Sequence, residues 1–188
     1  MFLFCYGTRP EMIKMFPLID KFNKNKIPYK TLFSGQHKDL FEQFKSYLPK
    51  PNFVMDIMEK DQSLNKLTSK IFAHMDILDF SGVTHIIVQG DTTTAYAMAM
   101  GAFNKKLKVV HLEAGLRTYN KYSPYPEEMN RTLISKITDI HLCPTEMAVN
   151  NLKKEGITNN VFLVGNTVVD AFELISGNNK ILEQPTLL

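Results

Sequence analysis

The sequence lacks the features that identify most metalloproteins and membrane proteins. Its 188 residues include two cysteines, Cys5 and Cys143, which form no cluster that suggests zinc. Both lie in apolar stretches, so we expect buried free thiols. No apolar stretch approaches the roughly 20 residues that cross a bilayer. The first residues also lack the basic start of a signal peptide, so we expect a protein of the reducing cytoplasm.

Two common nucleotide-binding motifs are also missing. No G-x-G-x-x-G is present, which argues against a bound dinucleotide, and no G-x-x-x-x-G-K-[ST] is present, which excludes a P-loop ATPase. The net charge of +3 is small and evenly spread, which argues against a nucleic-acid partner. We therefore expect no cofactor, no metal, no nucleic acid and no membrane among the binding partners.

The order of predicted elements indicates an α/β fold. Apolar strand-like stretches alternate with stretches of helical periodicity along the whole chain. Predicted strands cover residues 2–6, 31–33, 53–57, 83–89, 108–112, 140–143 and 161–164. Predicted helices cover residues 10–22, 39–47, 64–78, 92–103, 126–137, 145–155 and 166–175, with a kink at Pro17. This order predicts a Rossmann-like parallel sheet with helices on both faces, over residues 1–176, and a linker over residues 177–188.

Three carboxylates collect at one edge of this predicted sheet. Asp91 and Glu113 each follow an apolar strand, and Glu127 opens the next helix. In open α/β sheets, ligands bind outside the carboxyl ends of the strands. Each acid also has a structural explanation, since Asp91 can cap its helix and Glu127 can complement a helix dipole. Three together are costly unless they hold cations or move protons, so we expect an acid–base site.

Basic residues lie near these acids. Arg117 is the nearest cation in sequence to Glu113, and a buried carboxylate needs a partner. Arg131 follows Glu127 by four positions, so the two can pair on one helix face. We expect His111, at the end of its strand, to be a packed core residue rather than a catalyst.

Two strand-to-helix turns are candidates for binding a phosphate or a sugar. In the turn 7–10, backbone N–H groups could meet a phosphate that Arg9 and Lys14 neutralise. The alternative is a tight turn with two solvated cations. In the turn 34–37, Gln36 and His37 could hydrogen-bond a sugar or phosphate, and a capped surface loop explains them equally well.

Five segments together resemble one enzyme family. They begin at Gly7, Gly90, Glu113, Ser123 and Gly165, and read GTRPEMIK, GDTTT, EAGLRT, SPYPEEMNR and GNTVVD. In this order they resemble the non-hydrolysing UDP-N-acetylglucosamine 2-epimerases. The similarity runs from the first strand to the last helix and covers that family's amino-terminal domain only.

The resemblance implies one half of a GT-B-like two-domain enzyme, with the substrate between two Rossmann-like halves. The implied reaction interconverts UDP-GlcNAc and UDP-ManNAc by eliminating UDP across C1–C2 and adding it back. The family's acids match Asp91, Glu113 and Glu127, and its diphosphate-binding positions match Arg9 and Lys14. We expect Arg117 and Arg131 to contribute to substrate binding as well.

The resemblance also implies that parts of the family's enzyme are missing from this sequence. The family's second, UDP-binding domain is missing from the sequence, so we expect little activity from this chain alone. Gln36 and His37 match a regulatory UDP-GlcNAc site, but Asp39 and Lys70 depart from the residues usual there. A homodimer is also implied. Two alternatives stay open, namely a hydrolysing 2-epimerase that releases UDP and ManNAc, and a non-catalytic half-domain that binds a sugar nucleotide or a partner.

Overall fold

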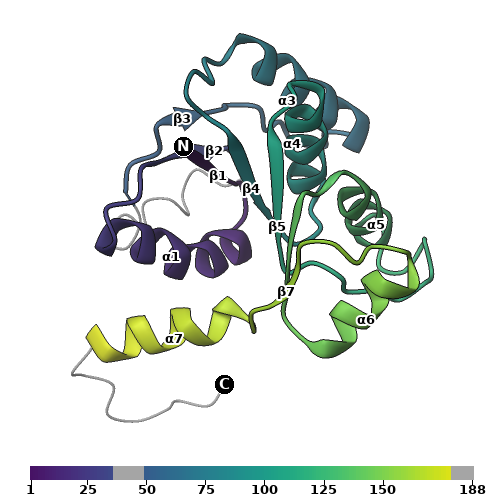
Figure 1. The fold of residues 1–188 in the computed structure, drawn as a ribbon. Coiled ribbons are helices and arrows are strands. Elements are labelled where there is room, and N and C mark those ends of the chain that lie inside the picture. The colour runs from purple at the N-terminus through teal and green to yellow at the C-terminus, as the bar shows by residue number, and fades with distance from the viewer. Residues whose placement is uncertain (36–48, 179–188) are drawn as a thin grey trace, which may run out of the picture.

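The protein forms one seven-stranded parallel sheet in the computed structural model, which describes residues 1–35 and 49–178 (Figure 1). The strand order is β3-β2-β1-β4-β5-β6-β7. The strands are β1 (Phe2–Tyr6), β2 (Tyr29–Phe33), β3 (Phe53–Val54), β4 (His85–Gln89), β5 (Lys108–Leu112), β6 (Ile140–Cys143) and β7 (Val161–Leu163). The order reverses between β1 and β4, and at such a reversal the carboxyl ends of the strands leave a crevice for ligands.

Helices cover both faces of the sheet because successive strand side chains point to opposite sides. They are α1 (Arg9–Lys24), α3 (Leu64–Ile77), α4 (Thr93–Asn104), α5 (Glu127–Ile137), α6 (Glu146–Lys154) and α7 (Thr167–Asn178). Leu3 and Cys5 of β1 pack in the core shared with α3, α4 and α5. Phe4 and Tyr6 pack in the core shared with α1 and α7, which run side by side (Figure 1). The predicted Rossmann-like fold class is confirmed.

Most predicted elements are present within a few residues of their predicted bounds. Pro17 does not end α1, which continues to Lys24. Helix α7 extends three residues beyond the predicted end, to Asn178. The predicted helix 39–47 and most of the predicted linker lie outside the described residues. The division of the chain into a domain over residues 1–176 and a linker over residues 177–188 therefore stays a prediction.

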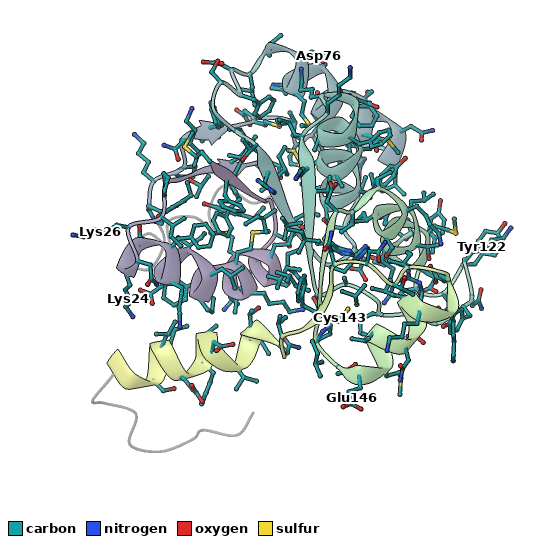
Figure 2. The ribbon with its side chains drawn as sticks, in the orientation of Figure 1. Lys24, Lys26, Asp76, Tyr122, Cys143 and Glu146 are labelled. Atoms are coloured by element: carbon teal, nitrogen blue, oxygen red, sulfur yellow. The ribbon has the colours of Figure 1, made fainter. Side chains whose placement is uncertain are left out.

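Both cysteines lie in the interior as free thiols, which confirms that expectation. Cys143 lies at the end of β6, inside the fold (Figure 2). In the part of the chain that the structure describes, no helix combines the length and apolar character that crossing a membrane requires.

Candidate active site

The turn after β1 is closed by a carboxylate from α1. Thr8 caps α1, and Glu11 reaches back to the backbone N–H groups of Gly7 and Thr8 at 2.8 and 2.7 Å. These two N–H groups are therefore not open to a phosphate, and that part of the prediction is wrong. Arg9 lies on the surface at the start of α1.

Glu113 lies directly after β5 and is held by two side chains, one from α1 and one from the end of β4. Lys14 Nζ donates to both of its carboxylate oxygens, at 2.8 and 2.6 Å, and Gln89 Nε2 donates to Oε2. The predicted pairing of Glu113 with Arg117 is wrong, because Lys14 reaches it from α1. Glu113 has a backbone φ of 68°, a left-handed conformation that costs energy for any residue with a side chain.

Asp91 lies in the loop between β4 and α4. It does not cap the helix, because the Thr92 side chain accepts the hydrogen bond from Ala95 N at 3.0 Å. Asn130 Nδ2 of α5 donates to the Asp91 backbone oxygen at 2.9 Å. Arg131 Nε lies 3.5 Å from the Asp91 carboxylate. The loop that carries Asp91 is thus fixed to α5.

The two glutamates in the first turn of α5, Glu127 and Glu128, differ in burial and in partners. Glu128 is buried and accepts hydrogen bonds from the backbone N–H groups of Thr118 and Tyr119, so it holds the preceding loop. Arg131 Nε lies 3.1 Å from Glu128. The predicted pairing of Arg131 with Glu127 is therefore wrong. Glu127 itself is half-buried.

The charges of the other two predicted acids act on Asp91. Burial raises the pKa of Asp91, and the negative charges of Glu113 and Glu127 raise it further, against the nearby charges of Arg131 and Lys14. The Nε of Arg131 is buried and within ion-pair distance of Glu128 and Asp91, although neither contact has the geometry of a hydrogen bond. The arrangement thus offers carboxylates able to exchange protons beside two cations.

Arg117 lies elsewhere. Its side chain is 1% exposed and donates to the Glu155 carboxylate at 2.6 and 3.1 Å and to Ser135 Oγ at 2.9 Å. These contacts join the loop after β5 to α5 and to the end of α6. Its substrate-binding role stays a prediction that these contacts do not support.

The prediction for His111 as a core residue is confirmed. His111 is buried, and its Nε2 hydrogen-bonds the Gly90 carbonyl oxygen at 2.8 Å. Gln36 and His37, the candidates for a regulatory site, lie outside the described residues. Within the described residues 1–35 and 49–178, no group of three or more His, Cys, Asp or Glu side chains is placed to hold a metal ion.

Sequence reasoning missed two residues of this site. Glu11 was overlooked because a glutamate three positions after a threonine is an ordinary helix start, although the motif S/T-x-x-E signals the capping contact itself. Gln89 was overlooked as the last residue of a strand. Its polar side chain at the end of a run that should be buried was the available signal.

A model of the family described as UDP-N-acetylglucosamine 2-epimerase matches residues 20–186 of this chain. The chain belongs to that family. The family predicted from the motifs is thereby confirmed.

Relatives with the same description support this membership. The UDP-N-acetylglucosamine 2-epimerase of Salmonella borreze is 44% identical over 183 residues, which are 95% of this chain and 48% of the relative. The crystal structure of the Neisseria meningitidis UDP-GlcNAc 2-epimerase bound to UDP-GlcNAc matches with a TM-score of 0.90 and 42% identity, over 96% of this chain and 50% of that one. The Methanocaldococcus jannaschii enzyme, in complex with UDP-GlcNAc and UDP, matches with a TM-score of 0.85 and 36% identity, over 96% and 51%. The chain therefore spans about half the length of the relatives it matches.

Proposed function

We propose that this chain supplies the acid–base half of a UDP-N-acetylglucosamine 2-epimerase. The observation that carries the proposal is the grouping of Asp91, Glu113 and Glu127 with Lys14 and Arg131 at the carboxyl ends of β4 and β5, beside the reversal of strand order. Two solved relatives hold UDP-GlcNAc, and one of them also holds UDP.

The proposed reaction needs the groups that this site offers. One carboxylate removes the proton from C2 of the sugar while the C1–O bond to UDP breaks, which leaves a 2-acetamidoglucal and UDP. UDP then adds back at C1 while a second acid delivers a proton to the opposite face of C2. Inversion at one carbon thus requires acid–base groups on both faces. Asp91 suits proton exchange, because burial raises its pKa toward the working range.

The leaving diphosphate needs positive charge. Arg131 is a largely buried cation whose Nε lies 3.1 Å from Glu128 and 3.5 Å from Asp91, and its guanidinium can also donate to a phosphate oxygen. Lys14 holds Glu113 in this structure, and Arg9 lies exposed at the start of α1. Arg131, Lys14 and Arg9 are the proposed substrate-binding set, and Arg117 is left out of it because its contacts with Glu155 and Ser135 favour a structural role.

We infer that a second, UDP-binding domain completes the site. The surface formed by β7, the residue after it and α7 exposes six large apolar side chains: Phe162, Leu163, Val164, Val168, Val169 and Phe172. Apolar patches of this kind on a folded domain mark contact surfaces. A domain seated there would exclude water from the acids and complete the diphosphate site. A homodimer and a cytoplasmic location belong to the same proposal, testable by light scattering and by cell fractionation.

The decisive experiment is turnover of UDP-GlcNAc in D2O by the chain alone and with a separately expressed second domain. The proposal expects deuterium at C2 of both UDP-GlcNAc and UDP-ManNAc, and only when both parts are present. Asp91→Asn should abolish this exchange, whereas Asp20→Asn on the surface of α1 should leave it unchanged.

Two other outcomes would contradict the proposal in different ways. Free UDP and ManNAc as the products would identify a hydrolysing 2-epimerase. Binding of UDP-GlcNAc without C2 exchange in the two-part mixture would identify a non-catalytic binding domain.

A further inference from the structure

Glu11 is a buried carboxylate near the site that takes no part in the proposed reaction. It is 1% exposed, and its carboxylate accepts four hydrogen bonds. Three reach Oε2, from the Gly7 and Thr8 backbone N–H groups and the Thr8 hydroxyl. The fourth reaches Oε1 from the Thr92 hydroxyl, at 2.6 Å, across 81 residues of sequence.

Helix capping explains only part of this arrangement. A capping box requires a Glu or Gln side chain that contacts the backbone at the cap, which here is Thr8. Burial raises the pKa of Glu11, which means that keeping the carboxylate charged at this position costs free energy. The bond to Thr92 lies outside the capping box and ties the start of α1 to a different loop.

Thr92 adjoins Asp91, and its hydroxyl has two partners. The hydroxyl accepts a hydrogen bond from the backbone N–H of Ala95, and this bond caps α4. It also donates a hydrogen bond to Glu11. On the other side of the loop, Asn130 holds the Asp91 backbone oxygen. Asp91 is therefore fixed between α1 and α5.

The start of α1 also positions the second acid, Glu113. Lys14 follows Glu11 by three positions, which places both on one face of the helix. Lys14 holds Glu113 after β5, while Glu11 holds the loop after β4. One helical turn thus sets the positions of two carboxylates that belong to different strands.

We propose that Glu11 is a positioning residue, which fixes Asp91 relative to Lys14 and Glu113 through the Thr92 hydroxyl. Its consequence for turnover rests on the proposed epimerase function. The positioning itself does not depend on that function, because it concerns the geometry of this chain alone.

The first test removes the hydroxyl and follows the Asp91 carboxyl group by ¹³C NMR titration of the chain. In Thr92→Val the loop loses its link to α1, so the pKa of Asp91 should fall toward its ordinary value. Thr92→Ser keeps the hydroxyl and should titrate like the wild type. Thr145→Val is the matched control, because Thr145 caps α6 through Ala148 N in the same way and has no bond to Glu11.

A second variant keeps the test valid if Thr92→Val does not fold. Glu11→Asp preserves the negative charge but shortens the side chain by one methylene, and it should change the Asp91 titration in the same direction. Because both changes act on one bond, the double variant should be no worse than the more severe single variant.

Turnover with the second domain gives an independent measurement. Thr92→Val and Glu11→Asp should lower kcat by about 10- to 100-fold with little change in KM, as expected for a misplaced catalytic group. If Thr92→Val and Glu11→Asp both titrate like Thr145→Val, the positioning role is refuted. Wild-type parts that show no turnover would refute the proposed function instead, and the NMR titration would still decide the role of Glu11.

Discussion

Lys14 shows how a single residue can serve both the fold and the site. Its ammonium lies 2.6 and 2.8 Å from the two oxygens of Glu113, and its side chain is 22% exposed. Hydrogen bonds to charged groups in such partly buried places stabilise a fold measurably, whereas exposed ion pairs contribute little. The same contact holds a proposed catalytic carboxylate in place.

Replacing Lys14 with Met should therefore lower the free energy of unfolding by about 1.5 kcal/mol, as for a partly buried charge-assisted bond. Lys24 on the same helix is the control, since it pairs with Asp20 at 2.7 Å but is 64% exposed (Figure 2). Lys24→Met should cost less than about 0.5 kcal/mol. Urea unfolding of both variants measures the difference, and equal losses would contradict the assigned role of Lys14.

His111 predicts a dependence of stability on pH. Burial, with smaller effects of His141 and Arg117, lowers its pKa from 6.5 to about 4. Between these values the unfolded chain binds a proton that the folded chain does not, so stability falls as the pH falls from 6.5 to 4. Below about 4 both states are protonated and the loss is complete. Asp91 and Glu11 act in the opposite direction, because burial raises their pKa values.

The variant His111→Gln isolates this contribution, since Gln can still donate to the Gly90 oxygen. Between pH 6.5 and 4.5 the wild type should lose about 2 kcal/mol more unfolding free energy than the variant. The comparison of slopes removes the contribution of the carboxylates, which both proteins share. Parallel curves from urea unfolding at each pH would show that His111 is not held neutral by the fold.

At the scale of elements, the Arg117–Glu155 ion pair joins the loop after β5 to the end of α6. Arg117 also donates to Ser135 of α5 and to the Leu116 carbonyl oxygen, so its guanidinium is well satisfied. Breaking a buried pair by removing one partner leaves an uncompensated charge, which is more damaging than replacing both. The contacts therefore predict a structural task for Arg117.

Arg117→Met should lower the free energy of unfolding by about 3 kcal/mol, as for a broken buried ion pair. The affinity of the folded fraction for UDP-GlcNAc should stay unchanged, as measured by calorimetry at a temperature where the variant is folded. Lys136→Met is the control, because Lys136 contacts the same Glu155 at 3.3 Å from a half-exposed position. Retained stability with lost affinity would restore Arg117 to the substrate-binding set.

At the scale of the whole molecule, large apolar side chains of β7 and α7 are exposed to solvent. They include Phe162 and Leu163 of β7 and Phe172 of α7, whereas Ala171 and Leu174 of α7 pack in the core shared with α1. The loop before α5 also exposes three tyrosines, Tyr119, Tyr122 and Tyr125, and the Tyr122 ring lies beside Lys121 (Figure 2). Large apolar side chains exposed together on neighbouring elements are typical of a contact surface.

Phe172→Asp tests whether this surface receives the second domain. Phe172 is 73% exposed, so the substitution should change the stability of the isolated chain by less than about 0.5 kcal/mol. It should nevertheless weaken association with the second domain and the C2 exchange that depends on it. Ile77→Asp, at a 78% exposed position on α3, should leave both unchanged. Equal effects at the two positions would contradict the assigned contact.

The elements and the edge of the sheet at which the acids lie were predictable from the sequence. Apolar runs such as residues 108–112 and 140–143 have the bounds of β5 and β6, because buried parallel strands tolerate few polar residues. The motifs also gave the correct family. The ion pairs were not predictable in the same way: Arg117 was assigned to Glu113 and Arg131 to Glu127 from their spacing in sequence, and both have other partners in the fold.

Local order along the chain was thus determined by the sequence itself, because periodicity, turn residues and helix starts act over a few positions. Only the tertiary structure decided which charges meet. Lys14 finds Glu113 across 99 residues, and Thr92 finds Glu11 across 81, because parallel strands end at one edge and bring distant loops together. Side-chain pairing there depends on distances in space, which spacing in the sequence does not contain.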